Sequence, residues 1–459
     1  MEKMKNRYLI LSLFLIALAL RLFLVPNRGF EADVAFWKSW GLATLDHGAV
    51  AGLPLTNNNY PTPFSYFLGF LAYLYRCIAN PYDFNSFWNS GNVLFLFIAK
   101  LPSILADLGI AGIILWIGKR TRSSDLSVEN RSIFPPLPYS FYFLLSILYL
   151  FNPVSLIDGA WWGQVDSLGV FVFLTAVILA ASDNPLLGGA VFMLSMMTKL
   201  QNMIYGPLFF LILWQLGSYK GLVKGILGAV SAFLVLNMEF FLKKSGSAVW
   251  KSLTSNYDYF PMMSLNAFNL WWIAAKGFGM QMSDKVLAVG MINAKTTGLI
   301  LFSTGYLIAV LTMIKETILN MWKNKTEPFK DNAHIARRGT PVERPQSRNL
   351  LQQSVYNLGK IFMWSEDQHN TFEECGVRTS DGGKRANENK DAFNEFQTSD
   401  ILFRFFTSLV IVALSFFLFQ TESHDRYAFP LIVFLLFWIP HTIASHTTIK
   451  ERIVFWKTT

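Results

Sequence analysis

Two acidic side chains near the start of the chain lie where a carboxylate would be expected to have a function. Glu31 and Asp33 belong to the segment RGFEADVAFWKSWG, residues 28–41, just after the first long apolar run. A carboxylate at such a membrane boundary is poorly hydrated unless it has a partner or a role. Held beside a substrate, it can take a proton from an attacking hydroxyl. Two plainer roles for Asp33 stay open, an interfacial carboxylate or a helix N-cap.

Further polar residues fall on the same predicted side of the membrane. They are Lys100, Asp107, Asp158, Gln164, Asp166, Lys199, Gln201, Glu422, His424, Asp425 and Arg426. Ionisable groups in or near the hydrocarbon are costly, so they usually face a wet cavity and pair with each other or with a ligand. The set predicts a cavity open to the outer side, with a base for a hydroxyl and with Arg or Lys to stabilise a departing phosphate.

Several of these residues also have structural interpretations. Asp166 is placed to cap a helix that begins near Ser167. Lys100 and Asp107 are seven residues apart on one helix face, which favours an internal ion pair over a ligand contact. His424 and Arg426 could extend their polar ends to the membrane boundary, although four ionisable residues between Glu422 and Arg426 favour a functional role.

The composition predicts an integral membrane protein. Of the 459 residues, 53% are hydrophobic and only 15% are charged, against roughly 25% charged in a soluble domain. The net charge of +9 does not indicate nucleic-acid binding, because Lys and Arg cluster in short loops between apolar runs. That clustering is typical of membrane topology determinants.

We expect an all-α protein with about ten transmembrane helices, since one crossing needs about 20 apolar residues. The predicted spans are 8–25, 93–117, 137–151, 166–182, 186–199, 202–216, 223–241, 296–314, 401–420 and 428–445. The basic N-terminus places the first loop outside the cytoplasm. Residues 63–79 are predicted to lie at the membrane interface, because a crossing there would turn the basic residues 119–122 outward.

The chain divides into three parts. Residues 1–322 form the first part of the transmembrane module, and residues 400–459 form its last two helices. Between them, residues 323–399 are rich in polar and charged side chains. Such a segment buries too little apolar surface to fold alone, so we expect a largely disordered cytoplasmic loop.

Taken together, several segments resemble the GT-C glycosyltransferases, and more narrowly the bacterial and archaeal relatives of the second mannosyltransferase of GPI-anchor assembly. The segments occur in the expected order along nearly the whole chain outside 323–399. They are FEADVAFWKSWG, YPTPFSYFLGFL, KLPSILADLGIA, FNPVSLIDGAWWGQVDSL, TKLQNMIYGPL, SLNAFNLWW and SHDRYAFPL. In the last motif Asp425 occupies the position where the family usually has Glu.

The resemblance implies transfer of a hexose such as mannose from a polyprenyl-phosphate donor to an acceptor hydroxyl, with inversion. Asp33 matches the catalytic base of this class. The residues implied to bind donor or acceptor are Glu31, Gln164, Asp166, Lys199, Gln201, His424, Asp425 and Arg426. No cofactor or metal is expected. The acceptor would be a glycan, glycolipid or protein, and the site would face outward from a plasma membrane, or the lumen of an endoplasmic reticulum.

The residues alone leave two other functions open. A transporter or flippase for a lipid-linked sugar would also need polar groups inside a bundle, although the sequence has no inverted repeat of the kind such proteins usually carry. A polysaccharide polymerase would share the outward site but use two lipid-linked chains.

Overall fold

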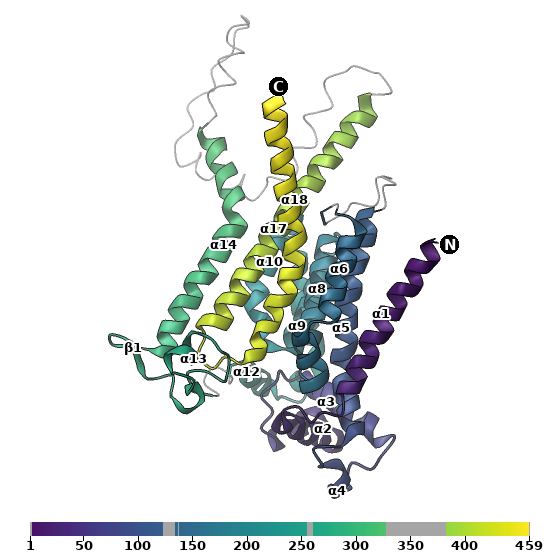
Figure 1. Ribbon diagram of the computed structural model, residues 1–459. Helices are drawn as coiled ribbons and strands as arrows, with labels where there is room; N and C mark the ends of the chain where they lie inside the picture. Colours follow the sequence, from purple (N-terminus) through teal and green to yellow (C-terminus); the bar gives the residue numbers. More distant parts are fainter. Residues whose placement is uncertain (1, 123–133, 136, 255–259, 327–381, 459) are drawn as a thin grey trace, which may run out of the picture.

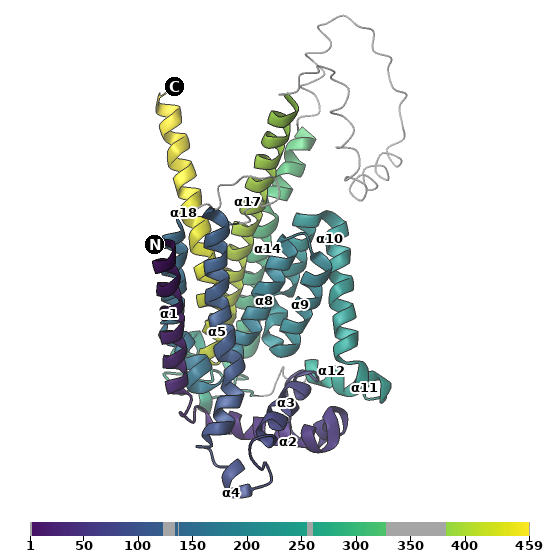
Figure 2. The same ribbon diagram turned by 90° about the vertical axis from the view of Figure 1, so that its right-hand side faces the viewer.

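The protein is a bundle of helices with a smaller group of helices across one end (Figures 1 and 2). The computed structural model describes residues 2–122, 134–135, 137–254, 260–326 and 382–458. In these residues the only strands are the short antiparallel pair β1 (Leu287–Val289) and β2 (Ile292–Asn293). The prediction of an all-α fold is therefore confirmed, and the long apolar helices fit a membrane protein.

The longer helices are α1 (Glu2–Leu24), α2 (Glu31–Gly52), α3 (Phe64–Arg76), α5 (Val93–Arg122), α6 (Tyr139–Leu150), α8 (Asp166–Ala181), α9 (Pro185–Thr198), α10 (Gly206–Leu236), α14 (Ala294–Thr326), α17 (Gly382–Phe419) and α18 (Phe429–Thr458). The shorter ones are η1 (Leu53–Leu55), α4 (Phe84–Phe87), α7 (Pro153–Ser155), the π-helix η2 (Leu156–Trp162), η3 (Leu200–Tyr205), α11 (Met238–Leu242), α12 (Gly246–Thr254), α13 (Leu270–Ala274), η5 (Gly279–Gln281) and η7 (Asp425–Ala428).

The predicted number of ten crossings is not supported. Among the described residues, six helices are long and apolar enough to span a membrane, or seven if the bent pair Tyr139–Leu150 and Pro153–Trp162 forms one span. The predicted spans 166–182 and 186–199 are α8 and α9, with 16 and 14 residues. At 1.5 Å per residue these helices are about 20–25 Å long, shorter than a hydrocarbon core of about 30 Å.

Two further predicted spans, 202–216 and 223–241, fall mainly in one bent helical segment, Leu200–Leu236. Its backbone leaves the helical conformation at Gly217 and Ser218, where Ser218 has a φ of 53°. Beyond this bend the segment packs on itself, because a Cβ added to Gly225 would lie 2.2 Å from Leu213 Cδ1. The bend falls between the two predicted spans, and hydropathy does not show that the two runs pack on each other.

The segment 63–79 contains α3, which has 13 residues. Its length of about 20 Å is too short for a crossing, in agreement with the interfacial prediction. The helix buries Phe64 and Leu68 against Trp37 and other residues of α2, and leaves Phe70 exposed. Together α2 and α3 lie across the end of the bundle away from the chain termini (Figure 2).

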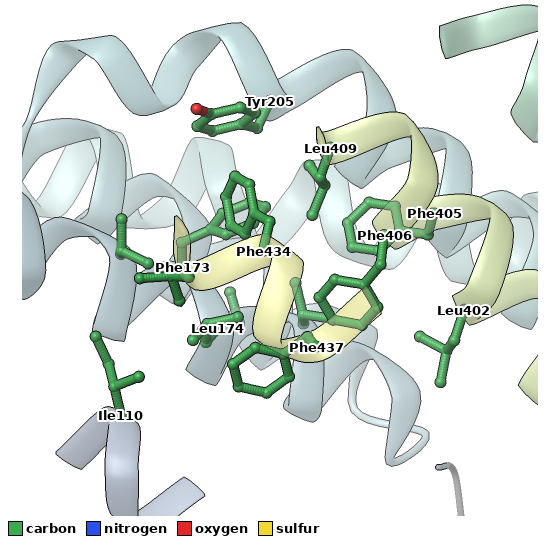
Figure 3. Packing of buried hydrophobic residues seen from close by; sticks show 14 of the residues in the cluster. Ile110, Phe173, Leu174, Tyr205, Leu402, Phe405, Phe406, Leu409, Phe434 and Phe437 are labelled. Carbon is green, nitrogen blue, oxygen red and sulfur yellow. The ribbon is translucent and has the colours of Figure 1, made fainter. Parts of the chain in front are cut away.

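Aromatic side chains form the centre of the bundle (Figure 3). The rings of Phe406 and Phe437 stack with centroids 5.4 Å apart, and Tyr205 meets Phe434 edge-on at 5.0 Å. Phe434 also contacts Phe173 of α8 at 5.8 Å. These contacts tie α18 to α8, η3 and α17, and so fix the place of η7, the turn directly before α18.

The predicted loop 323–399 is helical at both ends, since α14 continues to Thr326 and α17 begins at Gly382. The rest of the segment, including most of the predicted disorder, lies outside the described residues. The helices therefore extend beyond the apolar runs from which their ends were predicted.

Candidate functional site

The carboxylate of Asp33 lies between two side chains from distant parts of the chain. Gln164 Nε2 donates a hydrogen bond to Asp33 Oδ2 at 2.6 Å. Arg426 Nη1 lies 3.6 Å from the same oxygen. Asp33 stands in the first turn of α2, Gln164 just before α8, and Arg426 in η7. The structure thus joins the acid of the first loop to the two later motifs.

The turn after η2 presents Gln164 to Asp33. Gly163 has a φ of 90°, a left-handed conformation that favours glycine. The backbone amides of Gly163 and Gln164 both donate to the carbonyl of Asp158, at 3.1 and 2.9 Å. On the other side, Ser103 Oγ donates to the Gln164 carbonyl at 2.6 Å. These bonds leave the Gln164 side chain free to reach across to α2.

Lys100 clamps the two halves of the site together, and it is almost fully buried. Its Nζ donates to the carbonyls of Val25, Asn27 and Trp161, at 3.1, 2.6 and 2.7 Å. The first two carbonyls precede Asp33 and the third precedes Gln164. The segments also touch directly, since a Cβ on Gly29 would lie 2.3 Å from the Trp162 carbonyl oxygen.

The predicted ion pair between Lys100 and Asp107 is therefore wrong. Asp107 pairs instead with Arg21 of α1, whose Nε lies 3.2 Å from Asp107 Oδ2, both side chains being fully buried. Tyr149 donates to the other carboxylate oxygen at 2.7 Å. The seven-residue spacing places Lys100 and Asp107 on one face of α5. Each side chain nevertheless contacts groups from other segments, Lys100 the three carbonyls and Asp107 the Arg21 guanidinium.

Lys100→Met is expected to lower the free energy of unfolding by about 3 kcal/mol or more, because three carbonyls lose a charged donor. Thermal unfolding of the purified protein in detergent measures the effect as a lower Tm. Lys119→Met, on an exposed position of the same helix, is the matched control. Equal Tm values for the two variants would contradict the clamp.

Asp166 and Lys199 form a buried ion pair, with Lys199 Nζ 3.0 Å from Asp166 Oδ2. The predicted capping role of Asp166 is wrong, because Val165 is the N-cap and Asp166 is the first residue of α8. Lys199 lies at the extended break between α9 and η3. Such a pair is stable only with good geometry, and removing either partner leaves an uncompensated buried charge.

Aromatic side chains surround the cations of the site. The guanidinium of Arg426 lies 5.6 Å from the centre of the Trp162 ring and 6.0 Å from that of Tyr427. Burial raises the pKa of Tyr60, whose hydroxyl also responds to Lys199, Arg426, Asp166 and Asp33. The four charged residues thus lie within electrostatic range of one side chain.

Residues 260–295 pack against the segment just before Arg426 and hold it in place. Leu265 N donates to the Ser423 carbonyl at 2.9 Å, and Glu422 N donates to the Met262 carbonyl at 3.0 Å. Lys295 Nζ lies 2.8 Å from Glu422 Oε1 and 3.6 Å from Asp284 Oδ2. Glu422 therefore anchors a loop and lies apart from the Asp33 contacts.

His424 is held neutral. Burial, together with the positive charges of Arg426 and Lys199, lowers its pKa to about 2. A neutral imidazole does not attract phosphate as a cation would, so electrostatic clamping falls to Arg426 and Lys199. Asp425 is engaged locally, with its Oδ1 accepting from the Arg426 backbone amide at 2.9 Å.

The lowered pKa of His424 predicts a loss of stability in acid. The unfolded chain binds a proton below about pH 6.5 and the folded protein does not until about pH 2. Each pH unit below 6.5 then costs about 1.4 kcal/mol of folding free energy. The fall in Tm from pH 7 to pH 5 should be smaller for His424→Gln than for wild type. His47→Gln, at an exposed histidine, should keep the wild-type fall; equal falls for all three proteins would contradict the prediction.

Two more residues were predicted to bind donor or acceptor, Glu31 and Gln201. Glu31 is at the surface, where it pairs with Arg28 at 3.3 Å and both side chains are more than half exposed. Glu31 thus points away from the Asp33 contacts. Gln201 lies in η3, two residues after Lys199, with a buried Oε1.

Buried polar atoms without hydrogen-bond partners gather near these residues. In the part of the chain that the structure describes, they include Asp158 Oδ1 and Oδ2, Trp162 Nε1, Gln201 Oε1 and Arg426 Nε. Buried polar atoms in native proteins nearly always have partners, so each exception needs an explanation. Donors and acceptors of this kind suit a ligand that both accepts and donates hydrogen bonds.

One cavity among the described residues lies away from the candidate site. A cavity of about 170 Å³, lined by Asp183, Lys220 and Lys224 among others, lies at the far end of α8 from Asp166. It is separate from the candidate site. No group of three or more His, Cys, Asp or Glu side chains in the described residues is arranged to hold a metal ion.

Sequence reasoning missed Tyr60, Trp162 and Tyr427 as members of the site. Each stands inside a segment that carries the family resemblance, YPTPFSYFLGFL, FNPVSLIDGAWWGQVDSL or SHDRYAFPL. An aromatic ring beside a buried cation is a recognisable signal, because cation–π contacts are common for Arg.

No protein-family model matches the chain, and no curated protein matches it in sequence.

Proposed function

We propose that the chain is a membrane glycosyltransferase of the GT-C type that transfers a hexose, mannose in the first instance, from a polyprenyl-phosphate donor to an acceptor hydroxyl. The observation that carries the proposal is the carboxylate of Asp33, held by Gln164 with the Arg426 guanidinium beside it. A general base and an anion-stabilising group adjoin each other, as group transfer away from a phosphate requires.

In the proposed step, the acceptor hydroxyl lies against Asp33. Both described contacts engage Oδ2, so we assign Oδ1 to the hydroxyl proton. The acceptor oxygen attacks the anomeric carbon while its proton passes to Asp33. The bond from that carbon to the phosphate oxygen breaks on the opposite face, polyprenyl phosphate leaves, and the configuration inverts. Arg426 stabilises the charge on the leaving phosphate, and the paired Lys199 adds positive potential.

The unpartnered buried atoms support a sugar as ligand. Carboxylate and amide oxygens accept hydrogen bonds, whereas indole and guanidinium nitrogens donate them. A polyhydroxylated ring supplies the complement of both, because each hydroxyl donates one bond and accepts others. An apolar ligand would leave all of these atoms unsatisfied, at a cost of about 1–3 kcal/mol each.

We assign the site to the extracytoplasmic side, of a plasma membrane in a prokaryote or of the endoplasmic reticulum in a eukaryote. The helix α2, which carries Asp33, and the start of α18, directly after the η7 turn that carries Arg426, lie toward the end of the bundle away from both chain termini (Figures 1 and 2). The basic residues Lys220 and Lys224 adjoin the far end of α8. An excess of Lys and Arg marks the cytoplasmic side.

The test uses the full chain, purified and placed in liposomes with a labelled polyprenyl-phosphate mannose and candidate glycan, glycolipid or peptide acceptors. We expect the label to pass to an acceptor with release of polyprenyl phosphate in equal amount. Movement of intact donor across the bilayer without release would instead identify a transporter. Release that requires two lipid-linked chains would identify a polymerase.

A further inference from the structure

Asp158 is a buried carboxylate that the proposed transfer step does not use. It lies in the middle of η2 and is 3% exposed. Neither of its carboxylate oxygens has a hydrogen-bond partner within the described residues. Its backbone carbonyl, in contrast, accepts the two amides that form the Gln164 turn. The backbone that places Gln164 therefore also places Asp158.

Asp158 belongs to the candidate site. The charges of Asp166, Lys199, Asp107 and Arg426 all act on it, so Asp158 lies between the site and the buried pair of Arg21 and Asp107. Trp162, in the same π-helix, adds an unpartnered indole nitrogen, and Arg426 adds an unpartnered Nε. A buried carboxylate is almost always paired. The two carboxylate oxygens of Asp158 therefore mark a position where a bound ligand would supply the missing hydrogen bonds.

We propose that Asp158 binds two neighbouring hydroxyl groups of the transferred sugar, one at each carboxylate oxygen. Hydroxyls on adjacent ring carbons point the same way closely enough to meet the two oxygens of one carboxyl group, and each hydroxyl can both donate and accept a hydrogen bond. A cation is a poorer occupant, because Lys199 and Arg426 already place positive charge nearby. The assignment rests on the proposed function only for the identity of the ligand as a sugar.

The first measurement is the Tm of the ligand-free protein. Removing a buried carboxylate that lacks a partner relieves a cost, so Asp158→Asn and Asp158→Ala should each raise the Tm above wild type. Asp183→Asn, at an exposed position beyond the far end of α8, should leave it unchanged. A lower Tm for both Asp158 variants would show that the carboxylate is structural and would overturn the proposal.

The second measurement is binding of farnesyl-phosphate mannose and of its four deoxy counterparts, each lacking one ring or side hydroxyl. Wild type should bind two of them, deoxygenated at neighbouring carbons, about 10- to 100-fold more weakly than the parent. Asp158→Asn should bind the parent more weakly and no longer distinguish these two. Full discrimination by the variant would overturn the proposal.

Two further outcomes separate the proposals. A rise in wild-type Tm with Mn²⁺ or Mg²⁺ alone, absent from Asp158→Asn, would assign the carboxylate to a cation and overturn the inference. In one of them, the protein binds the sugar hydroxyls through Asp158 and yet never transfers the sugar. That result would support the role of Asp158 and refute the proposed transferase activity. Normal transfer with Asp158→Asn indistinguishable from wild type would refute the inference alone.

Discussion

Asp33→Asn is expected to reduce sugar transfer by about a hundred- to ten-thousand-fold, the usual contribution of a general base. Asparagine has nearly the same size and can still accept the 2.6 Å hydrogen bond from Gln164. The fold and the binding of donor should therefore persist. Turnover is measured with labelled donor at saturation, and donor affinity is measured separately by equilibrium binding.

Asp46→Asn is the matched control for this substitution, because Asp46 is an exposed acid on the same helix. It should transfer sugar at the wild-type rate. Wild-type transfer by Asp33→Asn would refute the assignment of the base. A loss of Tm as large as that of Lys100→Met would also count against it, since the acid would then be a structural element.

Arg426→Ala is expected to lower both turnover and donor affinity. Removing one well-placed charged donor to a developing anion costs about a hundred- to a thousand-fold in turnover. The lost contact with the ground-state phosphate should weaken donor binding by about tenfold or more. Arg426→Lys should recover part of the affinity, because it keeps the charge but not the planar donor fork.

The control is Arg76→Ala, at an exposed arginine of α3 that lies against the Tyr73 ring. It should retain both activity and donor affinity. If Arg426→Ala bound donor as tightly as wild type, the phosphate would have to be held elsewhere. Lys199 would then be the next residue to replace, together with its partner Asp166.

Much of the site was predictable because its residues are chemically conspicuous. Acids and bases are rare in apolar surroundings, so Asp33, Gln164 and Arg426 could be selected from the sequence by type and setting alone. Their convergence was a prediction that the distances now support. Glu31 is an acid in the same segment as Asp33, yet its side chain faces solvent. The direction of a side chain on a helix depends on how the helix docks.

Partner choice and helix number were not predictable for related reasons. Arg21 is a single cation in an apolar run, and only the packing of α1 against α5 shows that it meets Asp107. The predicted spans 202–216 and 223–241 are separated where α10 bends at Gly217 and Ser218, but hydropathy does not show that the two apolar runs pack on each other. The short helices α8 and α9 are apolar throughout, which makes them resemble full spans in sequence.

The contact between Asp33 and Arg426 joins α2 to η7, the turn directly before α18. A ribosome therefore makes the proposed base long before its cationic neighbour. A nascent chain that has inserted the helices up to α17 thus holds Asp33 without the guanidinium that faces it. Messages truncated upstream of codon 426 should accordingly yield inserted but inactive protein, and activity should return when the missing helix is supplied as a separate fragment that assembles with the rest.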